Sequence, residues 1–195
     1  MTRKYTQVTF TDSVKQAQEH FGSRATAAKV EGWDVDDEHL SARESAFIAE
    51  RDGFYMATVN EDGWPYVQFR GGPKGFLKVL DDATLAFADF RGNRQYISTG
   101  NLRASDRVAL FFMDYANQAR LKLMAHAEVF DAGERPDLLA QLEDPDYRAR
   151  VERLVVLRVV AFDWNCPQHI TPRFTLEEIS ELGVVPTAEA EGDPS

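Results

Sequence analysis

Apolar and polar residues alternate with a period of two over residues 120–130. The apolar positions are Leu121, Leu123, Ala125, Ala127 and Val129, and the intervening positions are Arg120, Lys122, Met124, His126 and Glu128. Successive side chains of a β-strand point to opposite faces. The alternation therefore predicts a strand with one apolar face and one largely polar face.

Further apolar segments of similar character predict six more strands. They comprise residues 54–60, 64–70, 75–80, 84–90, 107–115 and 153–165. Glu61-Asp62-Gly63 and Asp81-Asp82-Ala83 separate neighbouring segments in the way that hairpin turns do. Short antiparallel strands in this number favour a closed or nearly closed barrel. The sequence therefore predicts a mainly β fold with flanking helices, built on six to seven antiparallel strands.

Helix start signals flank the strands. Ser13 with Gln16, Ser41 with Glu44, and Thr175 with Glu178 resemble capping boxes. We also expect a short helix over residues 93–100 with Asn93 as its N-cap, and another within residues 134–150.

Three regions follow from these elements. We expect a helical extension over residues 1–50, a barrel over residues 51–182, and a polar tail over residues 183–195 that is disordered.

Composition and charge exclude several classes of protein. The 195 residues carry a formal charge of -10, which argues against nucleic-acid binding. No apolar run approaches the ~20 residues that span a bilayer, and the N-terminus lacks the apolar core of a signal peptide. The single cysteine, Cys166, excludes an intrachain disulfide. We therefore expect a cytoplasmic protein with no membrane contact.

One stretch departs from this acidity. Residues 64–126 contain nine Lys or Arg against five Asp, which gives a net charge of +4. The stretch is also rich in glycine, and glycine lets a backbone approach a ligand closely. Positive charge beside such glycines suits a small phosphorylated ligand.

The strongest candidate for a phosphate site combines residues of a predicted strand with residues of a loop. Gln68 and Arg70 are two residues apart, so they project to one face of the strand 64–70. Residues 91–95 combine glycine, asparagine and arginine ahead of the expected helix, and arginine can bind phosphate bidentately. The alternative is that these arginines form a solvated face, since short loops of this kind are weak motifs.

Other residues suggest weaker candidates. Arg120 and Lys122 could oppose an anionic ring, or they could be rim charges that face solvent. Cys166 and His169 are three apart, yet a metal site needs further ligands and a nucleophilic thiol needs a lowered pKa. Trp164 and Arg173 have the chemistry to close over a flat aromatic ligand. No phosphate-binding P-loop, zinc-protease, serine-hydrolase or dinucleotide-binding motif is present.

With these residues laid out, the chain resembles the pyridoxamine 5'-phosphate oxidase-like family of FMN-binding split barrels. The resemblance runs from about Arg51 to Phe174 and is densest in PYVQFRGGPKGF, LAFADFRGNRQYIS and HITPRF. It implies a split β-barrel that binds FMN as a homodimer, with the cofactor at the interface and a small-molecule substrate.

The family motifs also imply site residues. The implied cofactor-binding residues are Gln68, Phe69, Arg70, Gly71, Asp89, Asn93, Arg94, Gln95, Ser98, Arg120, Lys122, Trp164 and Arg173. Arg94 corresponds to the phosphate-binding arginine, whereas Gln68 and Gln95 replace an arginine and a lysine of the oxidase. His169 and Thr171 replace the substrate-binding arginine and histidine. The resemblance thus extends to the flavin and not to vitamin B6 oxidation.

Three functions remain open at this stage. The first is an FMN-dependent oxidoreductase with a small, unidentified substrate and no assigned catalytic residue. The second is a flavin-binding carrier or sensor without turnover. The third is a split barrel that binds haem or a deazaflavin.

Overall fold

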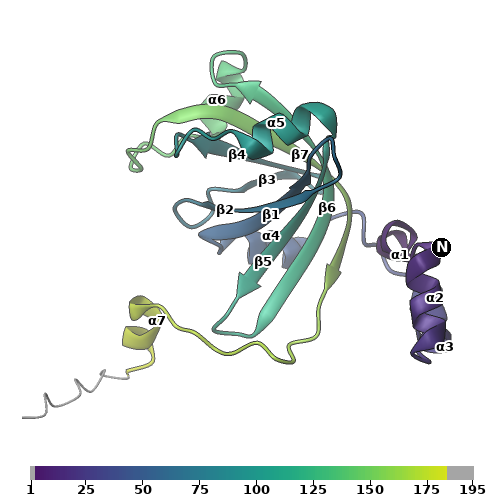
Figure 1. Cartoon of the computed structure of the whole chain (residues 1–195). Coiled ribbons are helices and arrows are strands. Elements are labelled where there is room, and N and C mark those ends of the chain that lie inside the picture. The colour runs from purple at the N-terminus through teal and green to yellow at the C-terminus, as the bar shows by residue number, and fades with distance from the viewer. Residues whose placement is uncertain (1–2, 184–195) are drawn as a thin grey trace, which may run out of the picture.

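Seven antiparallel strands form a single curled sheet in the computed structural model, which describes residues 3–183 (Figure 1). The strands are β1 (Gly53–Val59), β2 (Pro65–Gly71), β3 (Lys78–Asp81), β4 (Thr84–Phe90), β5 (Arg107–Asp114), β6 (Ala119–Asp131) and β7 (Val151–Trp164). Their order in the sheet is β2-β1-β5-β6-β7-β4-β3. β2 and β3 are therefore the two edges, and the curl brings them to the same side of the molecule. The predicted mainly β, antiparallel split barrel is confirmed.

The helices lie around this sheet. They are α1 (Lys4–Thr9), α2 (Asp12–His20), α3 (Arg24–Glu31), α4 (Ala42–Ala49), α5 (Ile97–Ala104), α6 (Pro136–Leu142) and α7 (Leu176–Glu181). The capping boxes predicted at Ser41 and Thr175 are confirmed. The box predicted at Ser13 is wrong, because the side chain of Thr11 caps α2.

One helix prediction is wrong in its bounds, whereas the helix expected within residues 134–150 is confirmed as α6. The helix expected over residues 93–100 begins at Ile97, and Asn93 is not its N-cap. Arg94 and Tyr96 have φ values of 63° and 55°, which no α-helix accommodates, so residues 91–96 form a loop instead. The helix within residues 134–150 ends at Leu142, three residues before Pro145, which disfavours helical backbone in the residue before it.

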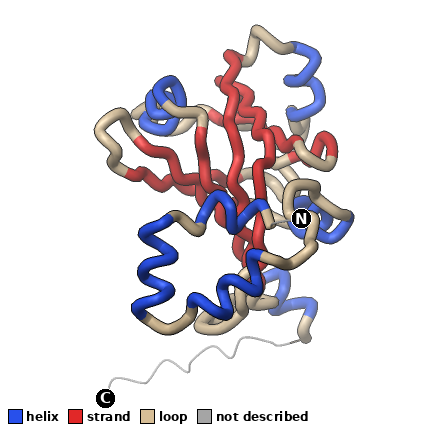
Figure 2. Tube along the Cα trace, turned by 90° about the vertical axis from the view of Figure 1, so that its right-hand side faces the viewer, coloured by secondary structure: helices blue, strands red, loops and turns tan. Residues whose placement is uncertain are grey.

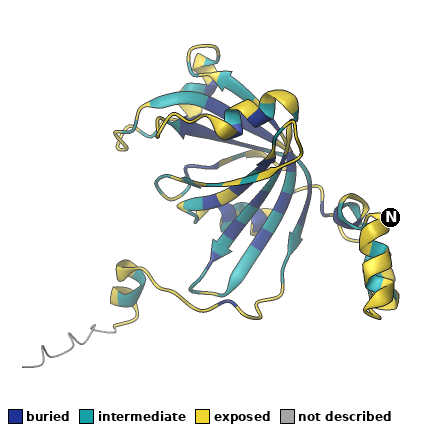
Figure 3. Cartoon of the chain, viewed as in Figure 1, coloured by how far each residue is buried: buried dark blue, intermediate teal, exposed yellow. Residues whose placement is uncertain are grey.

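The main core fills the concave side of the sheet. Its largest completely buried side chains include Phe54, Phe87 and Phe112, and the Phe54 ring centroid lies 5.5 Å from that of Phe87 and 5.3 Å from that of Phe112. Ile48 of α4 is completely buried in the same cluster. Figure 3 shows this burial along the strands, whereas α2 and α3 have no buried residue. α4 is therefore part of the barrel core, although it lies within the predicted extension.

One buried carboxylate attaches the N-terminal helices to the sheet. Asp37 is 2% exposed and accepts hydrogen bonds from the backbone N–H groups of Lys4 and Tyr5, each at 2.9 Å. Arg3 binds both Asp37 and Asp163 near the end of β7. In Figure 2 the helices α1 to α3 accordingly lie in front of the strands.

Within residues 3–183, no helix has the length and apolar character needed to cross a membrane. The tail predicted for residues 183–195 lies outside the described residues, apart from Gly183.

Replacing Phe54 by Ala should lower the free energy of unfolding by about 3–5 kcal/mol, because it empties the centre of the aromatic cluster. Urea denaturation of the wild type and the variant measures this loss. Trp64→Ala is the control, since Trp64 is 73% exposed and its removal should change the stability by less than about 0.5 kcal/mol. Equal stability of Phe54→Ala and the wild type would contradict this description of the core.

Candidate functional site

A polar pocket opens where the two ends of the curled sheet approach each other. Its volume is about 160 Å³. It is lined by Gln68, Arg70, Phe90, Gly92, Asn93, Arg94, Tyr96, Ser98, Thr99, Glu152 and Arg153. These residues come from β2, the end of β4, the loop between β4 and α5, the start of α5 and the start of β7. We call this set the arginine pocket.

The floor of the arginine pocket is an ion-pair cluster around Asp89. This residue is 4% exposed, and its two carboxylate oxygens are divided between two arginines. Arg70 Nη1 lies 2.5 Å from Oδ1, and Arg153 donates from Nη2 at 2.7 Å and from Nε at 2.9 Å to Oδ2. One negative charge thus balances two positive charges, so the cluster keeps a surplus positive charge at the pocket.

Asp89 satisfies only part of the Arg70 guanidinium. Its Nε atom is buried and has no hydrogen-bond partner. Burial lowers the pKa of the Arg70 guanidinium, an effect that Asp89 opposes and Arg153 reinforces, so the net pKa is lowered. An anion bound in the pocket would offset this desolvation.

The loop over residues 91–96 forms the outer wall. Asn93 Oδ1 accepts a hydrogen bond from the backbone N–H of Gln95 at 3.2 Å, which tightens the turn. Arg94 Nε donates to the Tyr96 hydroxyl at 3.2 Å, and this hydroxyl donates to Glu152 Oε2 at 3.3 Å. Left-handed backbone at Arg94 and Tyr96 costs conformational energy, and such costs are typical of functional loops.

Four arginines and two carboxylates gather here. Arg70, Arg94 and Arg153 line the pocket with Glu152, Asp89 lies beneath, and Arg91 Nε approaches Glu152 Oε1 at 3.6 Å. The formal charge of this group is +2. A phosphate monoester carries close to two negative charges at neutral pH, so the charges are complementary.

The inner wall is fixed by α5. Ser98 is 1% exposed and donates its hydroxyl hydrogen to Gln68 Oε1 at 3.0 Å. One turn further, Asn101 Nδ2 donates to Thr58 Oγ1 of β1 at 2.9 Å. The helix therefore holds the Gln68 amide in place beside the pocket.

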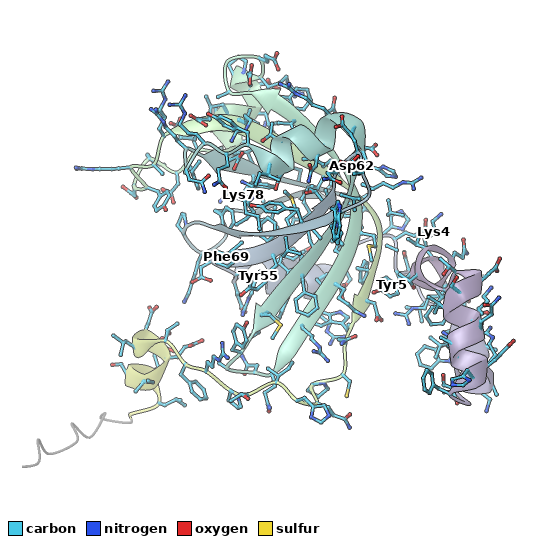
Figure 4. All side chains as sticks on the ribbon, viewed as in Figure 1. Lys4, Tyr5, Tyr55, Asp62, Phe69 and Lys78 are labelled. Atoms are coloured by element: carbon cyan, nitrogen blue, oxygen red, sulfur yellow. The ribbon has the colours of Figure 1, made fainter. Side chains whose placement is uncertain are left out.

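Two predicted residues of β2 face away from the arginine pocket. Phe69 alternates with Gln68 and Arg70, is 58% exposed, and packs against Tyr55 with ring centroids 5.5 Å apart. Figure 4 shows the labelled Tyr55 and Phe69 together on one side of the sheet. A side chain at Gly71 would meet the Phe69 ring at 2.8 Å, so glycine is needed there for packing. Phe69 and Gly71 therefore belong to the outer face.

Arg120 and Lys122 also lie on this outer face. Strand pairing aligns Lys122 with Phe111, which in turn pairs with Tyr55. An apolar hollow of about 390 Å³ on this face is lined by Tyr55, Ala57, Val67, Ala109, Leu110, Phe111, Lys122 and Met124. Arg120 donates from Nη2 to the carbonyl oxygen of Cys166 at 3.1 Å, and its Nε is buried without a partner. Within one chain, these cations are on the opposite side of the sheet from Arg70.

Trp164 and Arg173 lie apart from each other and outside the arginine pocket. Trp164 Nε1 donates to Glu44 Oε1 at 2.7 Å, and the Arg43 guanidinium stacks 4.3 Å from the indole centroid. Burial raises the pKa of Glu44, but hydrogen bonds from Ser41 and Trp164 outweigh it and the net pKa is lowered. The Arg173 guanidinium lies 5.0 Å from the Tyr115 ring centroid. Neither residue lines the arginine pocket of its own chain.

The segment with Cys166 and His169 shows no assembled reactive centre. Cys166 is exposed with a free thiol, and His169 has a φ of 65°. Among residues 3–183, no group of three or more His, Cys, Asp or Glu side chains is arranged to hold a metal ion.

Tyr96, Glu152 and Arg153 are among the pocket residues that the sequence analysis missed. Tyr96 fell inside a predicted helix, so its side chain had no assigned direction. Glu152 and Arg153 begin a long apolar strand, and their role depends on the pairing of Asp89 with Arg153. No spacing in the sequence indicates that pairing.

Comparison with known proteins identifies the family. The family model described as pyridoxamine 5'-phosphate oxidase matches residues 40–164. No curated protein sequence matches the chain.

Solved structures are similar to the chain. A protein of Lactobacillus delbrueckii described as a putative pyridoxamine 5'-phosphate oxidase has 23% identity and a TM-score of 0.50, covering 66% of this chain and 97% of its own. An FMN-binding protein from Syntrophomonas wolfei has 14% identity and a TM-score of 0.48, covering 80% of this chain and 96% of its own. HupZ from Group A Streptococcus has 16% identity and a TM-score of 0.48, covering 69% of this chain and 100% of its own. The match over most of the barrel shows that the chain belongs to the pyridoxamine 5'-phosphate oxidase family.

Proposed function

We propose that the chain binds FMN, with the flavin phosphate in the arginine pocket, and that it acts as an FMN-dependent oxidoreductase on a small substrate. The observation that carries this proposal is the net charge of +2 around a pocket of about 160 Å³, together with the unpartnered Nε of Arg70. Both features fit a phosphate dianion, which accepts several charge-assisted hydrogen bonds at once.

The phosphate would be held from three directions. Arg70 and Arg153 would act from the floor, where Asp89 fixes their guanidinium groups. Arg94 would act from the loop, together with the backbone N–H groups around Gly92 and Asn93. Gln68, which Ser98 orients, would offer a neutral donor for the rest of the ligand.

We propose that a second copy of the chain completes the site. Val67 and Phe69 are 59% and 58% exposed, and exposed apolar surface of this kind is typical of an interface. They alternate along β2 with Gln68 and Arg70. A partner that covers the outer face would therefore lie beside the edge of the arginine pocket, and it would supply the predicted residues that one chain keeps apart: Arg120, Lys122, Trp164 and Arg173.

FMN supplies the hydride or electron transfer when it is bound, and the protein supplies binding and electrostatics. Arg120 and Lys122 would stabilise negative charge that develops on a bound ring system. In one chain, Lys122 Nζ lies 3.4 Å from Asp163 Oδ2. Trp164 and Arg173 offer flat surfaces for stacking. The proposal assigns no side chain as a catalytic acid or base.

An absorbance spectrum of the purified protein tests the class of cofactor. Flavin maxima support the proposal, whereas a haem or deazaflavin spectrum contradicts it. Reduction by NAD(P)H, followed by reoxidation at a rate that depends on an added substrate, separates an enzyme from a flavin carrier or sensor.

Arg94→Ala should weaken FMN binding by roughly tenfold to a hundredfold, because it removes a charge-assisted contact to the phosphate. Riboflavin affinity should stay unchanged, since riboflavin has no phosphate. Fluorescence titration with both flavins measures the difference. Arg103→Ala removes an arginine of α5 outside the arginine pocket and is the matched control; Cys166→Ser should also retain full FMN binding. Unchanged FMN affinity in Arg94→Ala would refute the phosphate assignment.

Phe69→Asp should convert a dimer into monomers, because it places a charge on the exposed apolar surface of β2 that the partner would bury. Size-exclusion chromatography with light scattering gives the mass directly. Leu80→Asp on β3 is the control, since Leu80 is also an exposed apolar side chain, at 39%, but lies at the opposite edge of the sheet. A wild type that is monomeric at micromolar concentration, or a Phe69→Asp variant that stays dimeric, would rule out this interface.

A further inference from the structure

A carboxylate lies among the donors of the arginine pocket itself. Glu152, at the start of β7, lines the pocket, and 18% of its side chain is exposed. Its Oε2 accepts hydrogen bonds from the Tyr96 hydroxyl at 3.3 Å and from Arg153 Nη1 at 3.2 Å. Its Oε1 lies 3.6 Å from Arg91 Nε. Two donors that line the pocket, Tyr96 and Arg153, and the neighbouring Arg91 are thus directed at one internal anion.

Glu152 and Asp89 differ in their position relative to the pocket. Asp89 lies beneath the arginines, is 4% exposed, and binds Nη1 of Arg70 and both Nε and Nη2 of Arg153. Glu152 instead forms part of the wall, where a ligand's oxygen atoms would meet the same groups. Glu152 also accepts a hydrogen bond from the Tyr96 hydroxyl, which itself accepts a hydrogen bond from Arg94 Nε. The carboxylate therefore influences the loop arginine as well as Arg91 and Arg153.

We infer that Glu152 is an internal competitor for the phosphate group, and this inference rests on the proposed function. Carboxylate and phosphate oxygens bind arginine with the same fork geometry. They cannot occupy the same donors, and two anions side by side repel each other. A phosphate monoester enters by displacing Glu152 from Arg91, Arg153 and Tyr96. The residue thus lowers phosphate affinity and makes the bound ligand exchangeable.

Glu152→Gln tests this inference, because the amide keeps the shape and one acceptor while removing the charge. The variant should bind FMN more tightly, on the order of tenfold, since the competing charge is gone. Riboflavin affinity should not change. The melting temperature without ligand should fall, because Arg91 loses its carboxylate partner and Arg153 keeps only Asp89. Inorganic phosphate should raise this temperature more than in the wild type. Glu61→Gln, in the exposed β1–β2 turn, has the same change of net charge and should behave as the wild type.

The outcomes separate the inference from the proposed function. If the wild type prefers FMN to riboflavin and Glu152→Gln binds FMN equally or more weakly, the inference is wrong and the arginine pocket stands. If neither protein distinguishes FMN from riboflavin, the pocket does not bind the phosphate, and both proposals fall. Glu152→Asp keeps the charge but shortens the side chain. This variant should bind FMN with an affinity between those of the wild type and Glu152→Gln. An FMN affinity below that of the wild type would also overturn the inference.

Discussion

The buried carboxylate of Asp89 is the constraint on which the site depends. Asp89 belongs to β4, and its two partners belong to β2 and β7. β2 is one edge of the sheet, and β4 lies next to the opposite edge. The ion pair between Arg70 and Asp89 therefore spans the open side of the barrel, where no backbone ladder joins the strands.

This interaction links folding to binding. Removing one partner of a buried ion pair leaves an uncompensated charge, which typically costs 3–5 kcal/mol. Two guanidinium groups on one carboxylate keep one positive charge in excess, and the loop at residues 91–96 adds two further arginines. The same side chains that hold the two ends of the sheet together thus generate the positive potential of the pocket. An anionic ligand would stabilise the closed arrangement by binding it selectively.

Much of this architecture could be predicted from the sequence. The period of two in residues 120–130 and the hairpin signals gave the strands, and the alternation of Gln68 with Arg70 indicated a shared face. Helix bounds near residues 91–96 could not be predicted, because left-handed backbone at Arg94 and Tyr96 depends on tertiary contacts with β7. Arg153 was missed for the same reason: its partner lies 64 residues away in the sequence. Family motifs named Arg120 and Trp164 as neighbours of the ligand, yet in one chain they lie on other surfaces.

A crystal structure of the protein grown with excess FMN tests the central claim most directly. The account predicts phosphate oxygens within hydrogen-bond distance of the guanidinium groups of Arg70, Arg94 and Arg153. It also predicts that the ring system extends from Gln68 toward residues of a second copy. An arginine pocket without phosphate in that crystal, or FMN bound at another surface, would contradict the account.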